Sequence, residues 1–505
     1  MFVGVLQNFQ SVIGHLKYYL LERYYMQTIQ VGMTVLCLLL SAVATLLFYE
    51  KAIIGLAIVP LFIGVGIVAL VYHNMEKALM FLLIASTVLN VGIGTGTGTP
   101  ITLTLIMLLL LIGLWAFRVL IADRSWANFV TTPANIPVFL FALVVVISFW
   151  WSMNYVEPEL RYVFADKFNP RMMTALVLII SPITPLLLGS LIRHENTLKF
   201  FTWWFIVYGT LAVTLLIVLK DGFPHFILNA RGQLPAWAAT LALGQLFFNP
   251  SLPKLVRLLC VVSIGMWLYL QLVLGISWIS GWLTVFVGLG VVTLLYSRKL
   301  VLLALVGVAV VALVKIDYIN EILESENEES GSTRVLAGQQ TFSILGRHFL
   351  FGTGPAGYHF YIEHEIRNQV IQLSHNNYID IMAQTGVVGF ALYILIWAGL
   401  GWMCLKAYLS SPVGTFRQGL GAAVLASWFV SLVSMMLGDW VTPFPYTQGL
   451  GGISYTIWHW MLPGIAIGLY QVNMRLAPSA ADVESVPVVP VAPSQRLVNL
   501  RKFIR

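Results

Sequence analysis

The sequence has little charge and almost no cysteine. Only 10% of its 505 residues are Asp, Glu, Lys or Arg, whereas soluble globular domains carry roughly 25%. The three cysteines, Cys37, Cys260 and Cys404, each fall inside an apolar run, so we interpret them as small buried hydrophobic residues. These scarcities argue against a soluble enzyme, a disulfide-stabilised domain and a cysteine metal site.

The sequence also lacks the short segments of alternating polar and apolar residues that are typical of a transmembrane β-barrel. Instead, 59% of the residues are hydrophobic, and apolar runs near 20 residues recur, long enough to cross a hydrocarbon core of about 30 Å as helices. We therefore predict an all-α, polytopic transmembrane helical bundle of about 12–14 spans. The expected helices lie near residues 30–49, 51–72, 77–93, 101–121, 135–153, 173–192, 199–219, 237–249, 253–274, 276–296, 299–316, 379–405, 418–438 and 450–472.

The basic residues predict the topology. Lysines and arginines gather in alternate connections, which places those connections and both termini in the cytoplasm and the chain in the cytoplasmic (inner) membrane. The net charge of +7 therefore reports orientation and indicates no nucleic-acid partner. The expected parts are an interfacial amphipathic segment (1–28), an N-terminal transmembrane bundle (29–316), a long extracytoplasmic loop (317–378), C-terminal transmembrane helices (379–474) and a disordered cytoplasmic tail (475–505).

His375 ends the long outer loop and stands at the start of an expected span. Asn376 and Asn377 follow it and can cap that helix. An imidazole at this boundary titrates near neutral pH and can accept a proton from an attacking hydroxyl, so we predict a catalytic base. A loop histidine that only hydrogen-bonds locally is the alternative. Asp439, near the end of another span, we interpret as a helix-end residue.

Four arginines on the expected outer face are candidates for binding an anionic substrate. Arg231 and Arg334 would suit a diphosphate, because a guanidinium pairs phosphate oxygens bidentately. Contact with lipid headgroups is the alternative for both. Arg161 and Arg171 lie where the positive-inside rule disfavours cations, and either substrate contact or pairing with neighbouring acidic residues would explain them.

The sequence predicts no cofactor and no metal. The glycine-rich stretches 94–98 and 352–357 do not stand between a strand and a helix, as nucleotide-binding loops do. The spacing of His348, His359 and His364 matches no metal-ligand pattern.

The run His375-Asn376-Asn377-Tyr378, with Gln384-Thr385-Gly386 after it, resembles the signature of the O-antigen ligase and polymerase superfamily. Arg334 and the Gly352–Pro355 turn also lie where that family has an arginine and a Gly-x-Gly-Pro turn. The resemblance covers roughly residues 235–400.

This resemblance implies a fold like that of GT-C type glycosyltransferases and a metal-independent, inverting transfer on the outer face of the membrane. The partners would be a polyprenyl-diphosphate-linked glycan donor, a glycan or lipid-glycan acceptor, membrane lipid and polysaccharide export proteins. His375 would be the general base. Arg231 and Arg334 would stabilise the leaving diphosphate, and Asn376, Arg161 and Arg171 would contribute to substrate binding.

One motif departs from the family. Many members carry a Ser-Arg-Gly-like motif at the outer start of a span, where residues 275–282 here read GISWISGW without an arginine. Either another cation such as Arg161 or Arg171 replaces it, or the donor differs, or the transferase activity has been lost. The alternatives are therefore a non-catalytic component of a polysaccharide export complex and a small-solute, inorganic-carbon-like transporter. A transporter should show ionisable residues at mid-membrane depth and broken helices in repeated halves.

Overall fold

The computed structural model describes residues 68, 71–89, 92–93, 101–122, 129–225, 228–274, 279–314, 332–365 and 374–476. The chain divides into two compact units, Met1–Met75 and Glu76–Arg505, and the following concerns the second. The predicted segment 1–28, the span 30–49, most of the span 51–72 and the tail from residue 477 lie outside the described residues.

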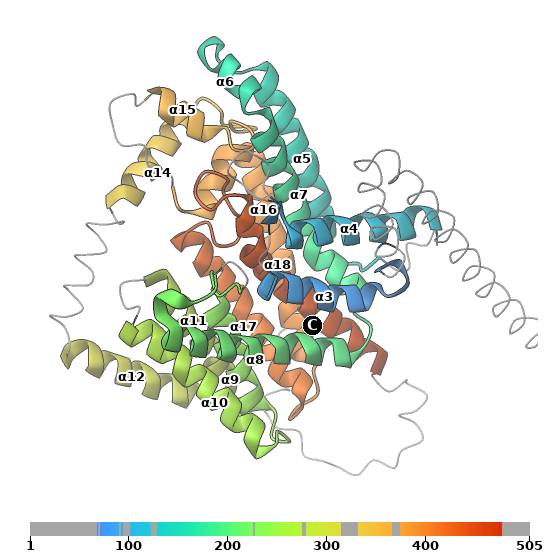
Figure 1. Cartoon of the computed structure of the whole chain (residues 1–505), viewed down its shortest axis with the longest axis vertical. Helices are drawn as coiled ribbons and strands as arrows, with labels where there is room; N and C mark the ends of the chain where they lie inside the picture. Colours follow the sequence, from blue (N-terminus) through green and yellow to red (C-terminus); the bar gives the residue numbers. More distant parts are fainter. Residues whose placement is uncertain are drawn as a thin grey trace, which may run out of the picture. The chain divides into compact units, whose positions relative to one another are not determined.

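The regular secondary structure of the described residues is helical apart from one two-residue antiparallel pairing, β1 (Gly92–Ile93) with β2 (Ile101–Thr102), so the all-α prediction is confirmed. Each predicted span from residue 77 onwards overlaps a helix. The helices are α3 (Met75–Thr87), α4 (Leu103–Phe117), α5 (Asn135–Asn154), α7 (Phe168–Leu191), α8 (Glu195–Leu219), α9 (Leu234–Phe248), α10 (Lys254–Tyr269), α11 (Ile279–Tyr296), α12 (Arg298–Val314), α16 (Asn377–Ser410), α17 (Phe416–Leu437) and α18 (Ile453–Leu476) (Figure 1). Within the described ranges, seven helices are long and apolar enough to cross a membrane, which makes this a multi-pass membrane protein.

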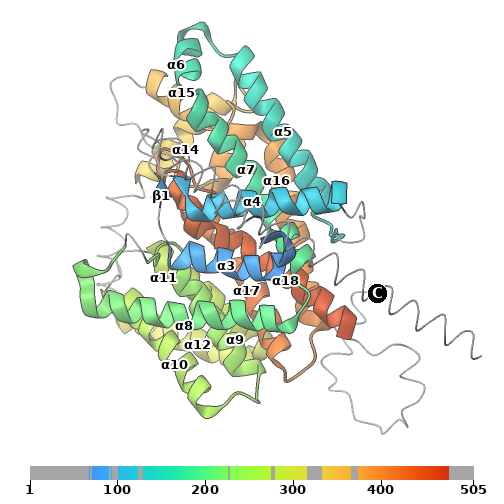
Figure 2. The ribbon, with the colours of Figure 1, turned by 45° about the vertical axis from the view of Figure 1, so that its right-hand side comes forward.

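Two groups of helices form the interior of the bundle. The helix α18 packs against α7, α16 and α17, and α9 packs against α8, α10, α11 and α17 (Figure 1, Figure 2). The outer helices instead expose apolar side chains: Ile136 and Phe139 on α5 are 72% and 71% exposed. In a soluble protein such faces would be a liability, but in a bilayer they meet lipid tails.

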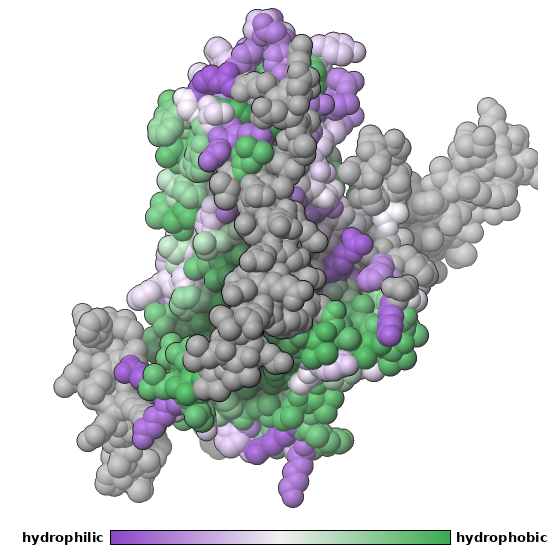
Figure 3. All heavy atoms as spheres, turned by 90° about the vertical axis from the view of Figure 1, so that its left-hand side faces the viewer, coloured by the Kyte–Doolittle hydropathy of each residue, from purple (hydrophilic) through white to green (hydrophobic). Residues whose placement is uncertain are grey.

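A separate apolar layer covers the end of the bundle that carries the long loop. It joins η3 (Pro158–Leu160), α6 (Arg161–Asp166), α14 (Ser332–Leu345) and α15 (Tyr358–Glu365), and its buried residues are Val156, Leu160, Phe164, Ile344, Ala356, Tyr358, Phe360, Tyr361, Ile362, Ala383 and Phe444. Hydrophilic residues gather over this end, and apolar residues lie below them (Figure 3). Much of the predicted long loop is therefore folded.

Glu157 ties this layer together. Its carboxylate accepts a hydrogen bond of 2.5 Å from the hydroxyl of Tyr361 and lies 3.3 Å from Nε2 of His348. Burial raises the pKa of Glu157, but the Tyr361 hydrogen bond and the nearby His348 outweigh it, so the net pKa lies below the usual value. The carboxylate is therefore ionised at neutral pH and holds α15 against the segment before η3.

The helix α16 is broken at Gly386, whose φ of +68° and ψ of −174° are not helical. Residues 349–353 fill the break: the amide of Thr353 donates to the carbonyl of Ala383 (2.9 Å), and the amide of Val387 donates to the carbonyl of Phe349 (2.9 Å). Irregular backbone inside a membrane bundle is tolerated where protein satisfies its polar groups. The Gln384-Thr385-Gly386 motif and the glycine-rich turn therefore pack against each other and are held together by backbone hydrogen bonds.

Arg171 anchors the same turn, and both sequence interpretations of it were wrong. It is fully buried, its Nη2 donates to the Ser152 hydroxyl (2.5 Å), and its Nε donates to the Pro355 carbonyl (3.3 Å). The guanidinium carbon lies 3.9 Å from the centre of the Phe164 ring, a cation–π contact. The physical reason is that α7 begins at residue 168 rather than 173, so Arg171 points into the protein from its first turn.

We predict that Gly386→Ala lowers the free energy of unfolding by about 2 kcal/mol or more, because a positive φ and a buried overlap each cost about that order. A Cβ at this position would lie 2.2 Å from the carbonyl oxygen of Leu350. Gly265→Ala in α10 is the control, since its Cβ meets nothing within 4 Å and Ala favours a helix by up to about 1 kcal/mol. Thermal unfolding of both variants in detergent measures this, and equal stabilities would contradict the role of the break.

Candidate functional site

His375 stands directly before α16 in an unusual backbone conformation. Its φ is +44°, in the left-handed region that non-glycine residues seldom adopt, and its side chain is 49% exposed. Strained backbone of this kind is kept where the surrounding structure imposes it, and it concentrates at functional sites.

The two asparagines that follow have different roles. Asn376 caps α16 as predicted, because its side-chain oxygen accepts hydrogen bonds from the amides of Tyr378 (3.0 Å) and Ile379 (3.3 Å). The buried Asn377 takes no part in the cap. Its Nδ2 donates to the carbonyl of Thr442 (2.7 Å), and its Oδ1 accepts from the amide of Val441 (2.9 Å). It therefore fixes the segment after α17 beside the start of α16.

That segment brings Asp439 to His375. Oδ2 of Asp439 lies 3.6 Å from Nδ1 of His375 and also accepts a hydrogen bond from the hydroxyl of Thr447. The Asp439 side chain is completely buried, whereas the imidazole faces outward. Asp439 lies two residues after the end of α17, as the sequence predicted. Its buried carboxylate, however, requires a charged or hydrogen-bonding partner, and His375 and Thr447 provide them.

A second buried carboxyl group, Asp380, lies behind Asp439, and sequence reasoning missed it. Its Oδ1 accepts hydrogen bonds of 2.5 Å from the hydroxyls of Tyr358 and Ser374. Burial raises the pKa of Tyr358 well above its usual range, and Asp380 and then Asp439 raise it further, so the phenol remains a donor. Asp380 is in the first turn of α16, five residues after His375, which is the signal that could have revealed it.

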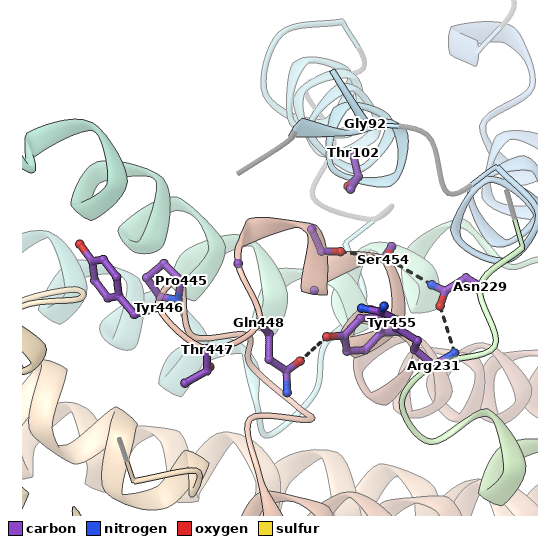
Figure 4. Close-up of a pocket in the computed structure, with 13 residues that line it drawn as sticks. Gly92, Thr102, Asn229, Arg231, Pro445, Tyr446, Thr447, Gln448, Ser454 and Tyr455 are labelled. Atoms are coloured by element: carbon purple, nitrogen blue, oxygen red, sulfur yellow. Dashed lines mark hydrogen bonds between the residues drawn. The ribbon is translucent and has the colours of Figure 1, made fainter. Parts of the chain in front are cut away.

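A cavity of about 480 Å³ lies beside Thr447, the residue whose hydroxyl bonds Asp439 (Figure 4). Arg231 and Tyr455 stand on one side of it and Tyr446 on the other, and Thr447, the residue that bonds Asp439, also lines it. The remaining lining residues are Gly92, Thr102, Asn229, Pro445, Gln448, Gly449, Gly451, Gly452 and Ser454.

Arg231 is held at the cavity by Asn229. The Asn229 side chain donates to the carbonyl of Ser86 and to the hydroxyl of Ser454, both at 3.1 Å, and accepts from the amide of Arg231 at 3.2 Å. Gly232 then turns the chain with a φ of +64°, where a Cβ would lie 2.9 Å from the Tyr455 ring. Three separate segments thus fix the backbone of an exposed cation.

For the other two predicted arginines, Arg334 and Arg161, the structure gives a position in the fold but no contact with the cavity. Arg334 is in the first turn of α14, and its side chain lies outside the described part of the structure. Arg161 begins α6 and is exposed. Residues 275–278 of the motif without an arginine are not among the described residues. Within the described ranges, no group of three His, Cys, Asp or Glu side chains is arranged to hold a metal ion.

The arrangement combines three chemical functions. A half-exposed imidazole faces a buried carboxylate through Nδ1, which leaves Nε2 for a proton-donating substrate. The distance of 3.6 Å exceeds a hydrogen bond, but such contacts often shorten only when substrate binds. A guanidinium lines the adjoining cavity and can stabilise an anion.

Comparison with known proteins gives a family match for the part of the site around His375. Residues 261–394, which include His375, Asp380 and the break at Gly386, match the family model described as O-Antigen ligase. A search of curated proteins gives no match. A solved chain from a study of "a peptidoglycan synthase complex" is 18% identical, covers 68% of this chain and 98% of its own, and has a TM-score of 0.39, which indicates nothing about activity. The segment that carries His375 and Asp380 is therefore similar to the O-antigen ligase family, and the superfamily resemblance is confirmed there.

Proposed function

We propose that this protein is a glycosyltransferase that polymerises or ligates glycans from a polyprenyl-diphosphate carrier onto a sugar hydroxyl at the outer face of the cytoplasmic membrane. The family match supports a membrane glycan ligase or polymerase in general. The observation that carries the finer proposal is the half-exposed imidazole of His375, one nitrogen of which faces the buried carboxylate of Asp439. Asp439 in turn accepts a hydrogen bond from Thr447, which lines a cavity together with Arg231.

The chemistry requires a base and an anion site. The acceptor hydroxyl gives its proton to Nε2 of His375 as its oxygen attacks the anomeric carbon of the donor sugar. The bond from that carbon to the diphosphate oxygen breaks, and its electron pair leaves with the diphosphate. A single displacement of this kind inverts the anomeric centre. Asp439 stabilises the imidazolium that forms, as the carboxylate of a catalytic triad does.

The leaving diphosphate needs positive charge. Arg231 lines the cavity and is exposed, and its guanidinium can take phosphate oxygens with two parallel hydrogen bonds. Arg334 and Arg161 remain candidates for further contacts with the donor. The side-chain amide of Asn376, whose Nδ2 also donates to the carbonyl of Met436, remains a candidate for contact with the acceptor. Because the bond to diphosphate in the donor is already activated, the protein needs only to position the substrates and to stabilise the charge that develops.

We predict that His375→Asn lowers kcat by about 10²–10⁴-fold, the usual contribution of a general base. Asparagine tolerates the left-handed backbone at this position, so the protein should stay folded. The measurement is transfer from undecaprenyl-diphosphate-linked oligosaccharide by the full-length protein in lipid nanodiscs. His364→Ala, a histidine of the same loop, is the control. Unchanged transfer in His375→Asn would remove the enzymatic assignment.

We predict that Arg231→Lys raises KM for the lipid-linked donor about tenfold, because a point charge cannot make the bidentate contact. Its thermal stability should match that of the wild type. Arg171→Lys is the matched comparison, because its guanidinium is buried among Ser152, Pro355 and Phe164. That variant should lose thermal stability while KM for the donor stays unchanged. The reverse pattern would move the diphosphate site from Arg231 to Arg171.

A further inference from the structure

Two buried carboxyl groups meet behind His375. Asp380 and Asp439 are 2% and 0% exposed. Asn377, which lies three residues before Asp380, bonds the backbone of Val441 and Thr442 just after Asp439, and so brings the two carboxyl groups together. Oδ2 of Asp380 and Oδ1 of Asp439 receive no hydrogen bond from any described N–H or O–H group. Two buried carboxylates side by side cannot both be ionised, because their repulsion in a low dielectric is large. One shared proton satisfies both orphaned oxygens.

The groups that surround Asp380 and Asp439 determine which of the two carboxyl groups holds the shared proton. Asp439 faces His375, the group that becomes cationic in the proposed reaction, and it accepts from Thr447. Asp380 faces the hydroxyls of Tyr358 and Ser374 and has no cationic neighbour among the described residues, and the Tyr393 phenol is the further titratable group near it. Charge is therefore best placed on Asp439, and the proton on Asp380.

We propose that Asp380 is a neutral positioning residue: its protonated carboxyl group donates a hydrogen bond to Asp439 and holds the Asp439 carboxylate toward Nδ1 of His375. Without it, Asp439 would lose the partner of its inner oxygen and would turn or take up water. The residue never touches substrate, and it acts through Asp439 alone. The proposal rests on the proposed function for its kinetic effect but not for its protonation state.

Comparison of Asp380→Asn with Asp380→Ala distinguishes a neutral hydrogen-bond donor at this position from a charged group. The asparagine amide can also donate to Asp439 while its oxygen accepts from Tyr358 and Ser374, so Asn should recover most of the activity that Ala loses. We expect Asp380→Ala to lower kcat about tenfold or more, the usual effect of losing a hydrogen bond to a charged group, with KM for the donor unchanged. Asp439→Asn should lower kcat at least as far, because it removes the charge itself.

If the wild-type protein transfers glycan, two kinetic results would overturn the proposal. If Asp380→Asn is as impaired as Asp380→Ala, Asp380 acts as a charge. If Asp380→Ala keeps the wild-type kcat, the pair does not position His375. Tyr358→Phe is the control, since it removes a donor to Asp380 but leaves the contact with Asp439, and it should show a smaller loss.

A spectroscopic measurement keeps the proposal testable if no transfer is found at all. The infrared difference spectrum between the wild type and Asp380→Asn at neutral pH should contain the C=O stretch of a neutral carboxylic acid. Its absence would show that Asp380 is ionised and would overturn the proposal. An inactive wild type that shows this band would instead sink only the proposed transferase function.

Discussion

The site depends on the hydrogen bonds of Asn377. This buried side chain ties the first turn of α16 to the backbone of residues 441 and 442, and so brings together two parts of the chain that are more than 60 residues apart. Because His375 directly precedes α16 and Asp439 directly precedes this backbone segment, the clamp fixes the imidazole and the carboxylate relative to each other. Buried polar contacts that are fully satisfied specify geometry in this way.

The break in α16 gives a second fixed point. A discontinuous helix is also a feature of transporters, whose exposed backbone groups bind solutes. Here the Ser148 hydroxyl lies 2.7 Å from the carbonyl of Gln384 and 2.6 Å from that of Phe351, and Thr353 bonds Ala383. The opened backbone groups are thus bonded by protein, which favours an anchor for residues 349–353 over a solute site.

The two carboxyl groups of the site are buried, whereas its arginine is exposed. Asp380 is shielded by Tyr358 and Ser374, Asp439 is buried but faces His375, and Arg231 is exposed at the cavity. Electrostatic interactions strengthen as water is excluded, so the inner carboxyl pair can orient the imidazole while the outer arginine remains free to meet a mobile anionic ligand. From the sequence alone, Arg171 and Arg231 were both candidates for binding an anionic substrate. Arg171 is instead fully buried and stabilises the turn before α15.

The sequence by itself determined the helical membrane fold, the position of most spans and the candidate base, since apolar runs and a polar cluster at a span boundary are local signals. It also placed the cap at Asn376, because capping joins residues two or three positions apart. Only the tertiary structure decided that Arg171 is buried, that Asp439 faces His375 and that Asp380 lies behind it. These pairings join different helices, and the spacing of residues within one helix does not record which residues of another lie beside it.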